Sequence, residues 1–134
     1  MFSVIKYITT FVCILILSNG CRQPVIPTEE DLAGYGWTLY EQGEYQEARE
    51  WFYDAVDKDS SFADGYNGIG WCFGKLRQAD SAAAYFHISQ TKPFDPYDTP
   101  DLDLDLYAGL TFAYSGMHVD SLVRTYAAYV LVER

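Results

Sequence analysis

Gly34-Tyr35-Gly36-Trp37 recurs as Gly68-Ile69-Gly70-Trp71, an interval of 34 residues. The same register extends outside this tetrapeptide, because small and large apolar residues recur at the same interval. The matched pairs are Leu32 and Tyr66, Leu39 and Phe73, Ala48 and Ala82, and Phe52 and Phe86. A third, looser copy contains Gly109-Leu110-Thr111-Phe112, flanked by Tyr107 and Tyr114. A fixed interval of this length indicates a chain built from repeated units.

Apolar residues at helical spacing fill each copy. The sequence predicts six helices, over 29–42, 45–58, 62–76, 79–91, 102–116 and 119–133. Thr28-Glu29-Glu30-Asp31 looks like the start of the first helix, since its acids lie at the positive end of the helix dipole. Asp59-Ser60-Ser61 is a plausible break between the first two helical hairpins. The expected fold class is therefore all-α.

The interval and the residue pattern resemble the tetratricopeptide repeat, a helix–turn–helix unit of about 34 residues. In the first copy, the stretch from Gln42 to Ala48 looks like the turn and the start of the second helix. In the second copy, Arg77 stands where that turn has a glycine. In the third, Thr111 replaces the helix glycine, and the turn is expected to be one residue shorter before Leu122 and Tyr126. The resemblance implies an α-solenoid of about three hairpins over residues 29–134.

The first twenty residues are typical of a signal peptide. Lys6 is their only charge, and the apolar run from Tyr7 to Leu17 is too short to span a bilayer comfortably. Leu17-Ser18-Asn19-Gly20-Cys21 resembles a bacterial lipoprotein processing site, which implies cleavage after residue 20, a lipidated (palmitate-bearing) Cys21 and a short tether over 21–28. The leucine lies four residues before the cysteine where the pattern has three. An uncleaved anchor and an ordinary secretory signal are therefore the alternatives.

Charge and cysteine content narrow the possible roles. The chain has 19 acidic and nine basic residues and a net charge of −10, which argues against nucleic acid as a partner because phosphates are bound by Lys and Arg. It also argues against a basic patch that docks on anionic lipid, so a lipid chain would provide the membrane tether. If Cys13 is removed and Cys21 acylated, Cys72 is left alone and is expected to be a small buried hydrophobe.

The resemblance implies that the first helix of each hairpin lines a concave groove. Carried over by register, the candidate partner-binding residues are Trp37, Tyr40, Trp71, Lys75 and Phe112. Aromatic rings suit peptide or sugar recognition because they bury much area with few rotatable bonds. The alternative is that these rings only fill the core. The other groove positions are Ala33, Glu41, Asp64, Asn67, Asp105 and Ala108.

No metal, cofactor or catalytic site is expected. Asp101-Leu102-Asp103-Leu104-Asp105 suggests a calcium loop, but an EF-hand would need Gly at Leu106 and a carboxylate at Phe112. His87 and His118 have no nucleophile or carboxylate beside them at recognisable spacing. We therefore expect a binding protein and not an enzyme.

The last predicted helix is apolar around most of its circumference, and it includes Tyr126, Tyr129 and Val130. Because helical stacks usually end on a polar face, this surface implies a protein partner, a second copy of the chain or the membrane. The expected role is a lipid-anchored scaffold of the bacterial cell envelope, at the outer membrane or cell surface, that binds a peptide or partner protein. The alternative is capture of a glycan or small molecule by a surface lipoprotein.

Overall fold

Six α-helices make up the part of the chain that a computed structural model describes, residues 25–95 and 99–132. They are α2 (Glu29–Gln42), α3 (Tyr45–Lys58), α4 (Ala63–Lys75), α5 (Ala79–Gln90), α6 (Leu102–Gly116) and α7 (Asp120–Val132). These residues contain no strand, so the predicted all-α class is confirmed. The predicted helix bounds differ from the observed ones by one residue at most. The predicted signal peptide, Cys21 and the tether up to residue 24 lie outside the described residues.

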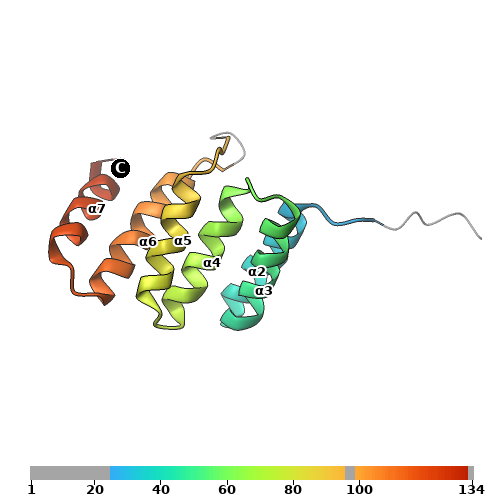
Figure 1. The fold of residues 1–134 in the computed structure, drawn as a ribbon, viewed down its shortest axis with the longest axis horizontal. Helices are drawn as coiled ribbons and strands as arrows, with labels where there is room; N and C mark the ends of the chain where they lie inside the picture. Colours follow the sequence, from blue (N-terminus) through green and yellow to red (C-terminus); the bar gives the residue numbers. More distant parts are fainter. Residues whose placement is uncertain (1–24, 96–98, 133–134) are drawn as a thin grey trace, which may run out of the picture.

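The helices pair into three hairpins, α2 with α3, α4 with α5 and α6 with α7, which stand side by side in a row (Figure 1). The first helices of the hairpins contact one another in order, α2 with α4 and α4 with α6. Among the described residues, the backbones of the second helices α3, α5 and α7 lie further apart, and these helices meet only through side chains, such as the Tyr53 and Tyr85 hydroxyls 3.1 Å apart between α3 and α5. The first helices therefore gather on one side of the row, which we call the first-helix face.

The start of α2 is fixed by a capping box. Asp31 N–H donates to Thr28 Oγ1 over 3.2 Å, and Thr28 N–H donates to Asp31 Oδ2 over 2.9 Å. This exchange satisfies two of the backbone donors that a helix start leaves unpaired. The capping sequence predicted at residues 28–31 is confirmed.

The turns inside the three hairpins are equivalent, although their sequences are not. Each turn has one residue in the left-handed region, Gly43 with φ 87°, Arg77 with φ 60° and His118 with φ 59°. In each, the next backbone N–H bonds back to the carbonyl five residues earlier, over 2.9–3.0 Å. The expectation of a shorter third turn is therefore wrong. Because the turn keeps its length, Ala127, and not Tyr126, is the third-hairpin equivalent of Phe86.

Two phenylalanines join the hairpins through close contacts with glycine. Phe52 is fully buried. A Cβ built on Gly36 of its own hairpin would lie 3.0 Å from its ring, and a Cβ built on Gly68 of the next hairpin would lie 2.4 Å from it. Phe86 is equally buried, and a Cβ on Gly70 or Gly109 would come within 2.7 Å or 2.4 Å of its ring. Each ring thus fits only where the neighbouring helices have no side chain.

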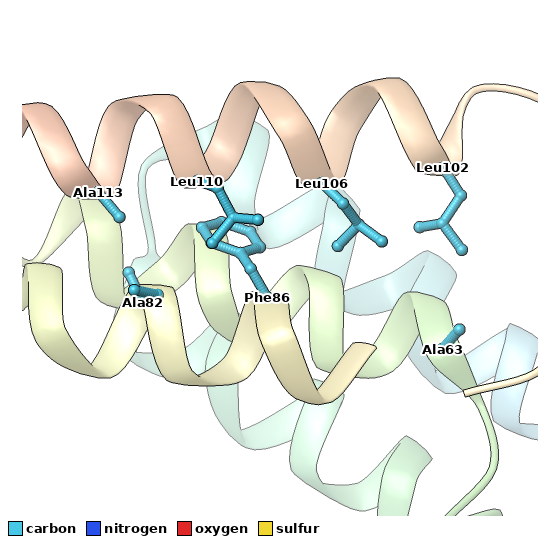
Figure 2. Packing of buried hydrophobic residues seen from close by; sticks show 8 residues of the cluster. Ala63, Ala82, Phe86, Leu102, Leu106, Leu110 and Ala113 are labelled. Atoms are coloured by element: carbon cyan, nitrogen blue, oxygen red, sulfur yellow. The ribbon is translucent and has the colours of Figure 1, made fainter. Parts of the chain in front are cut away.

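The second of these contacts lies in the core between the last two hairpins. Figure 2 shows Phe86 extending from α5 toward Leu110 of α6, with Leu106 beside it. All three side chains are buried. The third hairpin has no equivalent ring, since Ala127 stands at that position, and α7 has no buried residue in its described length. Packing therefore weakens toward the C-terminal end of the row.

Substitution of Gly68 by alanine tests this packing. A methyl group at 2.4 Å from the Phe52 ring must displace it, and overpacking costs about 1–3 kcal/mol, offset by up to about 1 kcal/mol of helix propensity. We expect Gly68→Ala to lower the free energy of unfolding by about 1–2 kcal/mol in urea titrations followed by circular dichroism. The control is Gly34→Ala in α2, where nothing lies within 4 Å of the new Cβ. That variant should be as stable as wild type or more so, and equal effects at both sites would contradict the account.

Candidate binding face

The five predicted partner-binding residues form two groups on the first-helix face. The Trp37 and Tyr40 rings of α2 lie 5.5 Å apart, and the Lys75 ammonium of α4 lies 5.9 Å from the Tyr40 ring. The Trp71 ring of α4 and the Phe112 ring of α6 lie 6.2 Å apart. The structure therefore brings Trp37, Tyr40 and Lys75 together and, separately, Trp71 and Phe112.

Both tryptophans on this face take part in the core as well. The Trp37 ring meets Phe52 edge-on at 4.9 Å, and the Trp71 ring meets Phe86 edge-on at 5.5 Å. Each indole is half-buried, so part of its surface is open. Phe112 is different, because 49% of it is exposed. One side of each indole therefore packs in the core, while Phe112 is the exposed ring among the four aromatic residues.

Asp64 is held in place by two neutral donors. Trp37 Nε1 donates to its Oδ2 over 2.8 Å, and Asn67 Nδ2 donates to its Oδ1 over 3.2 Å. The bond from Trp37 joins α2 to α4, the bond from Asn67 lies within α4, and together they fix the direction of the carboxylate. Neither donor carries a charge, so the negative charge of Asp64 is oriented without being neutralised.

A second carboxylate, that of Asp105 on α6, is influenced by the charge of Asp64. Burial of part of the group, together with the negative charge of Asp64, raises the pKa of Asp105 above its ordinary value, while a hydrogen bond from the Asn67 side chain acts in the opposite direction. Asn67 itself is buried, and its Oδ1 has no hydrogen-bond partner. Two like charges and an unsatisfied amide oxygen therefore meet where α4 and α6 run together, an arrangement that costs free energy in the absence of a ligand.

Beside Asp64 the face is hollowed by a cavity of about 640 Å³. It lies between the N-terminal parts of α2, α4 and α6 and the segment that follows α5. Its carboxylates are those of Glu30, Asp59, Asp64 and Asp95, and its apolar walls include Trp37, Phe62, Phe94 and Leu102. None of its described lining residues is Lys, Arg or His. The hollow is thus negatively charged with an aromatic wall.

The cavity was missed by the sequence analysis, although Asp64 and Trp37 were placed on the groove. Asp59 and Asp95 belong to connections between helices, whose course does not follow from helical spacing. The one available signal was the stretch from Pro93 to Pro100, which lengthens the interval between the second and third copies by seven residues. Part of that stretch, Pro93 to Asp95, lines the hollow.

The histidines and the cysteine lie outside this cavity. His87 hydrogen-bonds through Nε2 to the Tyr114 hydroxyl at 2.8 Å and through Nδ1 to Gln90 at 3.0 Å, so it joins α5 to α6. His118 is the left-handed residue of the last turn. Burial raises the pKa of the Cys72 thiol to about 12, as expected of a small buried hydrophobe. In residues 25–95 and 99–132 no three His, Cys, Asp or Glu side chains are grouped to hold a metal ion.

The predicted end surface on α7 is partly used inside the chain. The Tyr126 ring stacks on Tyr114 at 5.6 Å, and the Tyr129 ring stacks on Tyr107 at 4.8 Å, both across to α6. Tyr126 and Val130 are half-buried, whereas half of Tyr129 is exposed. Leu131 and Val132 are more exposed still. The open apolar surface therefore lies at the end of α7.

A comparison with models of protein families finds no match to the chain, and a search of curated proteins finds no similar sequence. Over the residues that the structure describes, no helix is long and apolar enough to cross a membrane. A role for the chain is therefore inferred from its own residues and their arrangement.

The raised pKa of Asp105 makes a prediction about stability and pH. The pKa of Asp105 in the folded state lies above its unfolded value of about 4. Ionisation of Asp105 therefore destabilises the fold. This destabilisation is absent below about pH 4 and reaches its full size above the raised folded-state pKa. We expect Asp105→Asn to raise the free energy of unfolding at pH 7, with a gain that shrinks as the pH falls toward 4. Urea titrations at several pH values measure this. A loss of stability in Asp105→Asn at pH 7 would contradict this prediction.

Proposed function

We propose that the chain is a membrane-anchored interaction module of the bacterial cell envelope, which binds a peptide or partner protein on its first-helix face. The observation that carries this proposal is the half-exposed Phe112 ring beside the half-buried Trp71 ring, 6.2 Å away on the neighbouring helix. Large aromatic rings that are rigidly supported and partly open are the usual anchors of protein interfaces. The proposal includes no bond-making chemistry.

We further propose that the three hairpins are of tetratricopeptide type. Support comes from positions that recur in both sequence and structure. Gly43 and Arg77, 34 residues apart, take the same left-handed turn conformation, and Phe52 and Phe86, also 34 apart, make the same contact with glycines of two hairpins. In repeats of this type each unit is stabilised by its neighbours, so the row presents one continuous face to a partner.

A second candidate function is capture of a glycan or small molecule. One observation favours it, because a cavity of about 640 Å³ falls within the size range of small-molecule sites. The hollow carries four carboxylates, which suit a cationic group better than a neutral sugar.

Substitution of Phe112 tests the binding role. The full-length protein would be isolated from its host membranes in mild detergent, and proteins that accompany it quantified by mass spectrometry. We expect one stoichiometric partner that binds wild type at least about tenfold more tightly than Phe112→Ala, since truncation of an interface anchor costs about 2 kcal/mol. Tyr35→Ala is the matched control, because Tyr35 is equally exposed (48%) but packs on Trp51 of α3.

Both substitutions should change the free energy of unfolding by less than about 1.5 kcal/mol, because each removes a half-exposed ring. Retention of the partner by Phe112→Ala, or equal loss in both variants, would contradict the assignment of this face. A wild-type protein without any stoichiometric companion would contradict the interaction role itself.

The proposed anchor has its own test. Mass spectrometry of the mature N-terminus should find Cys21 as the first residue, with a mass increase that corresponds to a diacylglyceryl group and an added acyl chain. An unmodified N-terminus, or one that begins at another residue, would contradict lipidation and leave an exported domain without this anchor.

A further inference from the structure

The Asp64 carboxylate is oriented by two neutral donors and has no ion-pair partner among the described residues. The two donors are the side chains of Trp37 and Asn67. Partial burial and the negative charge of Asp64 both raise the pKa of Asp105 on α6. Within the described part of the chain the one ion pair is Arg49 with Glu50, elsewhere on α3. A positive group placed between Asp64 and Asp105 would convert a repulsion into two attractions.

The hollow beside Asp64 extends this negative surface. Glu30 and Asp59 lie on its rim, and the pKa of Asp59 is lowered by hydrogen bonds from the Ser61 hydroxyl and backbone N–H, so its carboxylate stays ionised. Lys92 packs on the Tyr66 ring at 4.8 Å and is not part of the lining, although its charge also helps to lower the pKa of Asp59. Among the described residues, the lining of the hollow therefore contains no basic side chain.

The wall of the hollow suits an organic cation. Trp37 lines it, and its indole N–H is already committed to Asp64 over 2.8 Å, which fixes the plane of the ring. Aromatic faces attract ammonium and guanidinium groups, and carboxylates pair with guanidinium through two parallel hydrogen bonds. An aromatic ring fixed against an oriented carboxylate is thus complementary to arginine, and less specifically to lysine.

We propose that the segment bound on the first-helix face is a basic peptide of the partner protein, whose arginine or lysine side chains pair with Asp64 and Asp105 and enter the hollow beside Trp37. This inference rests on the proposed function, since it names the class of peptide that the interaction module takes. Charge complementarity identifies the occupant, because an acidic or neutral segment would leave the two carboxylates uncompensated. An anionic membrane surface is disfavoured for the same reason.

The test is isothermal titration calorimetry of the full-length protein in non-ionic detergent. The probes are short capped peptides of glycine alternating with arginine, with lysine or with glutamate. We expect the arginine peptide to bind most tightly and the glutamate peptide not to bind. The double variant Asp64→Asn/Asp105→Asn should weaken arginine-peptide binding at least about tenfold, as expected when charged partners of an interface are neutralised. The amide at position 64 keeps one oxygen acceptor, so it can retain the bond from Trp37 or the bond from Asn67 but not both.

The control removes the same two charges from another helix. Asp54→Asn/Asp57→Asn changes exposed residues of α3, and it should leave the affinity within about twofold of wild type, because screening weakens charge effects over distance. Equal weakening in the two double variants would overturn the proposal, because it would show general attraction to an acidic chain. Equal binding of the glutamate peptide, or no binding of the arginine peptide, would overturn it too.

Misfolding is separated from loss of the site by the single variant Asp105→Asn, whose unfolding midpoint at pH 7 should equal or exceed that of wild type while its affinity for the arginine peptide falls. If the arginine peptide does not bind but a partner protein binds in a way that depends on Phe112, this inference is contradicted and the proposed function still holds. A protein with neither peptide affinity nor a partner would contradict both.

Discussion

The close packing of two buried phenylalanine rings on glycine residues is the constraint on which the rest of the structure depends. Phe52 touches Gly36 in its own hairpin and Gly68 in the next, and Phe86 does the same with Gly70 and Gly109. Since each ring belongs to two hairpins at once, no hairpin completes its core alone. The glycines allow close approach, and this is why α2, α4 and α6 meet along one face.

That close approach creates the candidate site. Trp37, Asp64 and Asp105 come from three different helices, and their separation in sequence gives no indication that they interact. The indole of Trp37 reaches Asp64 over 2.8 Å, and Asp105 is influenced by the charge of Asp64. The acidic character of the whole chain takes a specific form here, because the Asp64 carboxylate is fixed in direction and neither it nor Asp105 has an ion-pair partner among the described residues.

Much of the fold could be predicted from the sequence, because the relevant signals are local and repeated. The 34-residue interval and the helical spacing of apolar residues placed all six helices to within one residue. The sequence of the third hairpin was aligned one residue out of register with the first two. Its turn has His118 in a left-handed conformation, and a histidine does not indicate such a turn in the sequence. Tyr126 was therefore matched to Phe86, whereas Ala127 takes that position and the ring contact is lost.

The candidate site could be predicted only in part. Helical register placed the five aromatic and basic residues and both aspartates on the groove, because each belongs to a regular helix. It could not say that Trp37 and Trp71 would share their rings with the core, since that depends on how closely the next helix approaches. The hollow depends on connections between helices, and Asp59 and Asp95 have no repeat position from which their location follows.

The most direct test of this account is a nuclear magnetic resonance titration of the full-length protein with the arginine peptide. The chain has three tryptophans, whose indole N–H signals report on separate places: Trp37 in the hollow, Trp71 beside Phe112, and Trp51 against Tyr35. The account predicts that the Trp37 signal shifts most, because its N–H is bonded to Asp64, and that the Trp51 signal stays in place. A shift of Trp51 as large as that of Trp37, or no shift at Trp37, would contradict it.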